Sequence, residues 1–257
     1  MPGTADIKAI VVDLDKTLLR SDKTLSPDTV RILGSCRRRG MKVMVATARP
    51  LRTTTPFCKL VDFDALVVSN GARVICGDRR TDHAIRPESA EALLHALLQR
   101  QDLRVTLETG DCAYSNLPID EYDTVLTDDL PGVAAEQGAL KILVHLDHRD
   151  TEPFVRHALP EGVYATVAHG TLMQVMSAEA TKWNGVKAML ALCSLTPEET
   201  AYFGDDQDDL EPIRLCGLGV AVSNAIDAVR AAADDIAGSN DEDGVARYIE
   251  QHLLESK

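Results

Sequence analysis

The stretch AIVVDLDKTLL, residues 9–19, decides the fold of this 257-residue chain. It begins as a short run of apolar, mostly β-branched residues and stops at Asp13, and a second carboxylate follows at Asp15. A continuous apolar run that ends in polar residues is typical of a buried strand in a parallel sheet. Two carboxylates about 4 Å apart repel each other by about 4 kcal/mol at an effective dielectric constant of about 20. A bound dication would turn this repulsion into attraction.

Strands and helices alternate outward from this stretch. Residues 26–39 are predicted to form a helix, because Ser26 suits the N-cap and Pro27 the first helical position. Further strands are predicted at 41–48, 64–69, 200–204 and 218–222, and further helices at 182–193 and 208–215. This alternation indicates an α/β fold with a Rossmann-like, doubly wound parallel sheet.

The middle of the chain follows a different pattern. We expect a hairpin over 72–76 and 81–85, a helix over 87–100, and then short strands at 103–108, 111–115, 139–146, 163–167 and 171–176. Such a run of short strands is typical of an α+β domain. The sequence therefore predicts a core domain formed by residues 1–79 and 180–257, with residues 80–179 inserted as a separate α+β domain.

Composition argues against several classes of partner. The formal net charge is −13 and the isoelectric point about 4.9, whereas nucleic acids and anionic membranes require a cationic surface. No window approaches the roughly 18 apolar residues of a membrane span, and the N-terminal residues do not resemble a signal peptide. The six cysteines show no metal-binding spacing. We expect a cytoplasmic protein that binds neither nucleic acid nor membrane.

Each strand of the predicted core ends in polar residues. Asp13 and Asp15 follow the first strand, Thr47-Ala48-Arg49 the second, Ser69-Asn70-Gly71 the third and GDDQDD (204–209) the fourth. Ligands of open parallel sheets bind beyond the carboxyl ends of the strands, so these groups are expected at one edge. Grouped carboxylates without a nearby Cys or His suit a hard divalent cation, Mg²⁺ above all. The competing interpretation is an acidic loop that binds nothing.

Four motifs occur in order along the chain: DLDKT at 13–17, ATAR at 46–49, Lys182, and GDDQDD at 204–209. Together they resemble the motifs of the haloacid dehalogenase superfamily. Asn70-Gly71, the inserted domain, GVAVSNA at 219–225 and EDGVA at 242–246 resemble the Cof-type branch of that superfamily. The resemblance extends over nearly the whole chain, and it implies that residues 80–179 form a C2-type cap that selects the substrate.

The resemblance implies a catalytic role for four residues. Asp13 would be the nucleophile that forms an aspartyl-phosphate; a carboxylate is already ionised at neutral pH and needs no activating base. Asp15 would protonate the leaving oxygen and then activate the attacking water. Thr47 would donate a hydrogen bond to a phosphoryl oxygen. Lys182 would neutralise charge, and it stands at the start of a predicted helix, where a cation is unfavourable unless an anion meets it.

The resemblance also implies a metal site. Mg²⁺ would be bound by the carboxylates of Asp13 and Asp205 and by the backbone carbonyl of Asp15, and Asp209 would support it through water. Two further residues would lie next to this site. Asp208 stands where the family usually has Asn, so its carboxylate would either tighten Mg²⁺ binding or face Lys182. Asn224 resembles a family residue near the metal, and the interpretation as a turn residue is nearly as well supported.

The remaining positions are less firmly assigned. Three residues match substrate-binding positions of the Cof-type branch: Arg49, Asn70 and Gly71. Arg49 can also be interpreted as a surface residue. Asp206 is either a water-bridged ligand or a solvated loop residue. We give no role to Lys16, which stands where the family often has Gly, and Lys187 is the rival candidate for the role of Lys182.

These features predict an enzyme, a Mg²⁺-dependent phosphatase acting on a small phosphorylated metabolite. Sugar phosphates are the first expectation, and nucleotide or cofactor phosphates the second; this choice rests on analogy. A phosphomutase or phosphotransferase is the alternative, since an aspartyl-phosphate can also be passed to a second hydroxyl group. A non-enzymatic Mg²⁺-dependent phosphoacceptor is disfavoured by the second carboxylate at Asp15.

Overall fold

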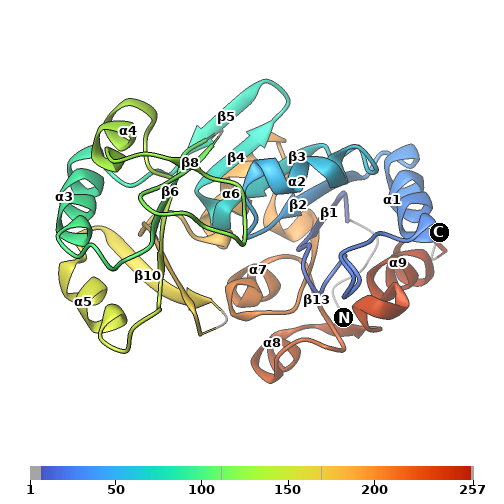
Figure 1. Ribbon diagram of the computed structural model, residues 1–257. Coiled ribbons are helices and arrows are strands. Elements are labelled where there is room, and N and C mark those ends of the chain that lie inside the picture. Colours follow the sequence, from blue (N-terminus) through green and yellow to red (C-terminus); the bar gives the residue numbers. More distant parts are fainter. Residues whose placement is uncertain (1–6, 111, 169, 256–257) are drawn as a thin grey trace. The chain divides into compact units, whose positions relative to one another are not determined.

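The structure is a computed structural model that describes residues 7–110, 112–168 and 170–255 (Figure 1). Residues 1–6, to which the expectation about a signal peptide applies, and residue 111, at the start of a predicted strand, lie outside the described residues. The chain forms two compact units. The core unit comprises Met1–Arg49, Thr53–Thr81 and Thr181–Lys257, and the inserted unit comprises Pro50–Arg52 and Asp82–Ala180.

The core unit is built on an eight-stranded sheet with the order β14-β13-β12-β1-β2-β3-β4-β5. The strands are β1 (Ala9–Val12), β2 (Lys42–Ala46), β3 (Ala65–Val68), β4 (Arg73–Cys76), β5 (Arg79–Asp82), β12 (Thr200–Gly204), β13 (Leu218–Val222) and β14 (Asp235–Ala237). The strands from β14 to β3 run parallel, and β4 joins β3 in antiparallel orientation. The predicted fold class, an α/β fold with a parallel sheet, is confirmed.

Several helices accompany the strands of the core sheet. They are α1 (Pro27–Arg38), α2 (Leu51–Cys58), α6 (Lys182–Leu192), α7 (Leu210–Leu215), α8 (Asp227–Ala232) and α9 (Gly244–Tyr248), and a π-helical segment (Ile249–Leu254) follows α9. Helix α1 contacts α9 and the π-helical segment, and α7 contacts both α6 and α8. Helix α1 begins as predicted, because the Ser26 hydroxyl accepts a hydrogen bond from the Thr29 backbone N–H over 3.0 Å.

The inserted unit contains a six-stranded sheet with the order β10-β11-β9-β6-β7-β8. Its strands are β6 (Val105–Glu108), β7 (Ala113–Ser115), β8 (Val125–Leu126), β9 (Lys141–His145), β10 (Val163–Ala168) and β11 (Leu172–Ser177). Its helices are α3 (Pro87–Leu98), α4 (Leu130–Gln137) and α5 (Thr151–Ala158). Alternate strand residues such as Val105 and Val144 join leucines of α3 in one apolar core, so the helices share one face of this sheet.

The order of the core strands brings distant segments together at the carboxyl edge of the sheet. Strand β1 lies between β12 and β2, with Val12 paired to Phe203 on one side and to Val45 on the other. The first residues after β1, β2, β3 and β12 therefore lie along one edge of the sheet, although they are far apart in the chain. No helix within the described residues is long and apolar enough to cross a membrane.

Candidate active site

Asp13 and Lys182 meet at the carboxyl edge of the core sheet. Asp13 directly follows β1, and its backbone N–H donates to the Phe203 carbonyl on β12 over 2.9 Å. Lys182 is the first residue of α6, and its Nζ lies 2.9 Å from Asp13 Oδ1. Both side chains are buried. A buried ammonium at the positive end of a helix is unfavourable by itself, so its presence here indicates that the acidic neighbours hold it.

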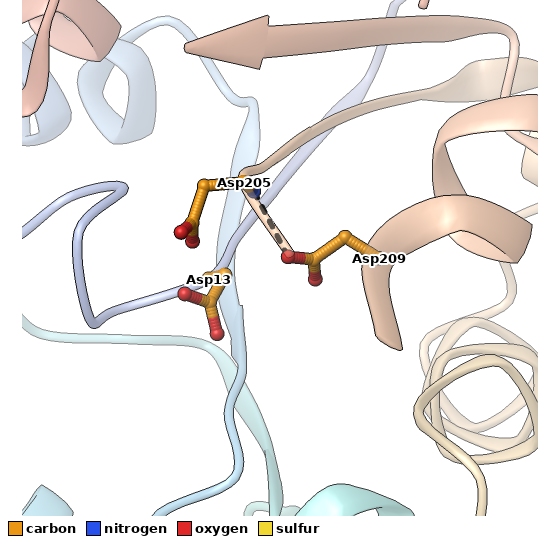
Figure 2. A group of neighbouring side chains, drawn as sticks. All are labelled: Asp13, Asp205 and Asp209. Carbon is orange, nitrogen blue, oxygen red and sulfur yellow. Dashed lines mark hydrogen bonds between the residues drawn. The ribbon is translucent and has the colours of Figure 1, made fainter. Parts of the chain in front are cut away.

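Three carboxylates surround this ammonium group. Asp13, Asp205 and Asp209 each offer a carboxylate oxygen, and these oxygens lie within 4.8 Å of one another; the three side chains converge in Figure 2. Burial, assisted by Asp209, raises the pKa of Asp205 to about 6. Burial, together with the charges of Asp209 and Asp205, also raises the pKa of Asp13, although Lys182 opposes this shift. Burial lowers the pKa of Lys182, but Asp13 and Asp209 outweigh it and raise that pKa above its ordinary value.

The oxygens of Asp209 already accept four hydrogen bonds. Oδ1 accepts from Lys182 Nζ over 2.7 Å and from the Tyr202 hydroxyl over 2.6 Å. Oδ2 accepts from the backbone N–H groups of Asp205 and Asp206, over 2.9 and 3.1 Å. A carboxylate has about four lone-pair sites, so those of Asp209 are filled by protein donors. Asp209 thus fixes the ammonium and the loop after β12, and this fits a supporting position better than direct contact with a metal.

The cluster fits a hard divalent cation. Asp13 and Asp205 present oxygen donors with spare lone pairs, and the Thr17 hydroxyl holds Asp205 by donating to its Oδ1 over 2.8 Å. Two of the three buried carboxylates contact the buried ammonium, and with all three ionised the cluster has two more negative charges than positive ones. Oxygen donors with this charge excess are suited to Mg²⁺ or Ca²⁺.

Asp15 lies apart from this cluster. Its carboxylate accepts two hydrogen bonds from the Arg49 guanidinium, over 2.6 and 2.7 Å, and a third from Lys23 Nζ over 2.8 Å. Burial tends to raise the pKa of Asp15, but the hydrogen bonds from Arg49 and Lys23 lower it to about 2. The structure therefore separates the two carboxylates of the D-x-D motif by giving each its own cationic partner.

The segment after β3 joins the site through an unusual backbone. Ser69, Asn70 and Gly71 have φ angles of 51°, 57° and 94°. A Cβ on Gly71 would lie 2.0 Å from the backbone oxygen of Thr181, so glycine is required where this segment meets the N-cap of α6. The amide of Asn70 donates to the carboxylate of Asp208. This contact connects the end of β3 to the loop after β12.

Thr47 is buried directly after β2, and its hydroxyl accepts from the Arg49 backbone N–H over 3.2 Å. Asn224 contacts the loop that follows Asp15: its side-chain amide donates to the Lys16 carbonyl over 2.7 Å. The carboxylate of Asp206 accepts from the Gln207 backbone N–H over 2.7 Å and so caps a short 3₁₀ helix. We interpret Asp206 as a loop residue.

Lys182 contacts the acidic cluster, and its rival Lys187 lies elsewhere. The ammonium of Lys187 lies over the ring of Trp183, 5.7 Å from its centroid. Sequence reasoning missed two other contacts, the one from Lys23 to Asp15 and the one from Tyr202 to Asp209. A tyrosine inside an apolar strand, two residues before the GDDQDD segment, was the available signal, because a buried hydroxyl requires a partner.

Comparisons with known proteins show which family the chain resembles. The family model described as haloacid dehalogenase-like hydrolase matches residues 10–249. The 5-amino-6-(5-phospho-D-ribitylamino)uracil phosphatase YitU of Bacillus subtilis is 27% identical, over 95% of this chain and 97% of its own length. Pyridoxal phosphate phosphatase YbhA of Escherichia coli is 24% identical, over 96% of this chain and 99% of its own length.

Solved structures show the same fold. A haloacid dehalogenase-like hydrolase from Bacteroides thetaiotaomicron superposes with a TM-score of 0.85 at 24% identity, over 95% of this chain and 99% of that one. The subclass IIB sugar phosphatase BT4131 superposes with a TM-score of 0.78 at 21% identity, over 96% of this chain and 99% of that one. The resemblance seen in the motifs is confirmed, because the family match spans nearly the whole chain. The protein belongs to the family of haloacid dehalogenase-like hydrolases.

Proposed function

We propose that the protein is a cytoplasmic, Mg²⁺-dependent phosphatase that transfers the phosphoryl group of a small metabolite to Asp13 and then to water. The observation that carries this proposal is the contact between Asp13 and Lys182 inside a cluster of buried carboxylates. The phosphatases among its relatives support the same reaction class.

Asp13 is the proposed nucleophile. Its Oδ1 accepts a hydrogen bond from Lys182, and its carboxylate therefore has a fixed direction and a second oxygen left for attack. Attack forms a bond from that oxygen to phosphorus, and the bond to the leaving alcohol oxygen breaks. The ammonium of Lys182 donates to Asp13 and Asp209, and its third N–H is available for a phosphoryl oxygen. Thr47, buried directly after β2, would donate its hydroxyl to another phosphoryl oxygen.

The carboxylates of Asp13 and Asp205 would hold Mg²⁺, together with the backbone carbonyl of Asp15. Bound Mg²⁺ would neutralise phosphate charge that otherwise repels an anionic nucleophile. Asp209 acts behind these ligands, because its oxygens hold Lys182 and the backbone of the loop after β12. The charge excess of the cluster supports a dication as its occupant.

Asp15 is the proposed general acid and base, and in its present contacts it has no proton to give. Its role requires that Arg49 release it, since the bidentate pair keeps the carboxylate ionised. A phosphate group offers the same planar pair of oxygen acceptors to a guanidinium. We infer that Arg49 exchanges Asp15 for the substrate phosphate, and that the released carboxylate takes up a proton from solvent and donates it to the leaving oxygen.

The proposed substrate class is a phosphate monoester of a small sugar or of a cofactor-like compound. Two curated relatives act on 5-amino-6-(5-phospho-D-ribitylamino)uracil and one on pyridoxal phosphate, so cofactor-like phosphates gain support relative to plain sugar phosphates. The inserted unit is the proposed selector of the leaving group. If Asp82–Ala180 is replaced by a short linker, activity on 4-nitrophenyl phosphate should persist in part, while activity on the preferred metabolite should fall much further.

The proposal is tested by phosphate release from a panel of phosphorylated metabolites in the presence of Mg²⁺. Asp13→Asn should abolish release from every compound. Asp28→Asn is the matched control, because Asp28 is exposed on α1 and pairs with Arg31. Release that survives Asp13→Asn, or a protein inactive on every phosphate ester with Mg²⁺, would contradict the proposed function.

A further inference from the structure

Tyr202 is linked to the nucleophile by a continuous series of hydrogen bonds. It is fully buried on β12, and its hydroxyl donates to Asp209 Oδ1 over 2.6 Å. The same oxygen accepts from Lys182 Nζ over 2.7 Å, and Nζ also donates to Asp13 Oδ1 over 2.9 Å. Three hydrogen bonds thus lead from the interior of the sheet to the proposed attacking group.

We propose that Tyr202 is a positioning residue that determines how the ammonium of Lys182 is shared between Asp209 and Asp13. The proposal rests on the phosphatase function inferred above. The hydrogen bond recorded for the Tyr202 hydroxyl goes to Asp209 and not to the nucleophile, so its influence on Asp13 would pass through Asp209 and Lys182.

The physical reason lies in the competition of two donors for one oxygen. With the tyrosine hydroxyl in place, Asp209 Oδ1 shares its charge between Tyr202 and Lys182. Without the hydroxyl, Lys182 becomes the single donor to that oxygen, and electrostatic attraction in a buried site of low dielectric is strong. The ammonium should then move toward Asp209 and away from Asp13. Its support for the nucleophile and for transferred phosphoryl oxygens would weaken.

A merely structural tyrosine in the same unit provides the control. Tyr248 on α9 is also buried, and its hydroxyl donates to Asp235 Oδ2 over 2.9 Å. Asp235 is not among the clustered carboxylates. Tyr202→Phe and Tyr248→Phe therefore remove the same chemical contact, a tyrosine-to-carboxylate hydrogen bond. They differ in whether the carboxylate holds Lys182.

The experiment measures turnover of 4-nitrophenyl phosphate with Mg²⁺, together with the thermal unfolding temperature of each variant. Both variants should lose a similar amount of stability. Only Tyr202→Phe should reduce kcat, by about tenfold, and KM should stay within about twofold of the wild-type value. Inhibition by orthovanadate, which mimics the transferred phosphoryl group, should weaken by a similar factor only in Tyr202→Phe.

A double-mutant cycle separates positioning from general loosening of the core. In Asp209→Asn the side-chain oxygen must face the backbone N–H groups of residues 205 and 206, so the amide nitrogen faces Tyr202 and Lys182. Adding Tyr202→Phe to Asp209→Asn should then cause no further loss of kcat. If the losses of kcat in the two single variants multiply in the double variant, the inference about Tyr202 is overturned. Equal kcat values for Tyr202→Phe and Tyr248→Phe would overturn it too, and neither result would touch the proposed function. An inactive wild-type protein would overturn the proposed function as well.

Discussion

Arg49 holds the carboxylate of Asp15 by two parallel hydrogen bonds, over 2.6 Å from Nε and 2.7 Å from Nη2. The pair is partly shielded from water, since the Arg49 side chain is 21% exposed, whereas Lys23, the other partner of Asp15, is 52% exposed. Exposed ion pairs contribute little, so Arg49 is the partner that decides where the carboxylate lies. The D-x-D motif thus divides into a buried group, Asp13, and one held by arginine.

The first prediction tests whether Arg49 also binds the substrate phosphate. Arg49→Lys keeps the positive charge but removes the planar pair of donors, so KM for phosphate monoesters should rise by about tenfold or more. Arg20→Lys is the matched control, because Arg20 makes the same kind of two-contact pair with Asp243. Steady-state kinetics on 4-nitrophenyl phosphate measure both, and equal KM values for the two variants would contradict a phosphate contact at Arg49.

The second prediction separates Asp15 from Asp13 by its dependence on the leaving group. Nitrophenolate departs without a proton, so Asp15→Asn should largely preserve the first step on 4-nitrophenyl phosphate. A sugar alkoxide requires protonation, and the rate of hydrolysis of a sugar phosphate should fall by a further factor of about 10²–10⁴. Since the second step requires Asp15 as base, rapid mixing should show a burst of about one nitrophenolate per active site. Absence of a burst together with equal losses on both substrates would rule out the acid and base role.

The third prediction concerns metal binding and pH. Burial, assisted by Asp209, gives Asp205 a raised pKa of about 6 in the metal-free protein. Its protonation therefore stabilises the folded state at low pH, and this contribution is lost as the pH rises through about 6. Mg²⁺ binds the deprotonated form and should offset the loss, so it should raise the unfolding temperature more at about pH 7.5 than at about pH 5.

Asp205→Asn provides the comparison for this measurement, because it removes the titrating group and keeps the side-chain size. The variant should show a smaller pH dependence of the Mg²⁺ effect on the unfolding temperature, because Asp13, whose pKa is also raised, still titrates at the site. Chelation of the metal should also abolish hydrolysis in the wild-type protein, and Ca²⁺, with its larger and looser ligand shell, should support it poorly. Full activity after exhaustive chelation would be incompatible with the metal site.

The fourth prediction concerns Gly71, which packs against the N-cap of the helix that carries Lys182. Gly71→Ala places a Cβ 2.0 Å from the Thr181 oxygen at a φ of 94°, so it should destabilise the protein by about 3 kcal/mol or more and displace Lys182. Gly77→Ala, at a φ of 57° with nothing within 4 Å of the new Cβ, should cost only about 1 kcal/mol and leave activity intact. Denaturant unfolding and turnover distinguish the two, and equal losses would indicate that the contact with Thr181 is unimportant.

Much of the core fold could be predicted from local sequence. The strands at 200–204 and 218–222 were predicted to the residue, because each is a short apolar segment with clear polar or turn residues at its end. The helix expected over 208–215 is instead a 3₁₀ turn followed by α7 (Leu210–Leu215). The second hairpin strand was expected at 81–85 and lies at Arg79–Asp82, because its four residues are exposed and carry no apolar pattern.

Several short elements were missed for a common reason. Helices α2, α4 and α5 are eight residues long, and each contains a proline. Strand β14 and helices α8 and α9 have three to six residues each. Segments of this length do not nucleate by themselves, so local propensity does not reveal them. They form because the finished sheets provide apolar surfaces for them.

By itself, the sequence determined which residues would stand at the carboxyl edge of the sheet, because the ends of strands are local properties. It also determined which family the chain belongs to, because the spacing of the motifs is local as well. Only the tertiary structure decided which of those side chains touch. Lys182 reaches Asp13 and Asp209 across long stretches of chain, Asp15 turns to Arg49, and Tyr202 meets Asp209 inside the core. Local sequence does not determine which partner a side chain meets, because the direction of a side chain depends on the elements packed around it.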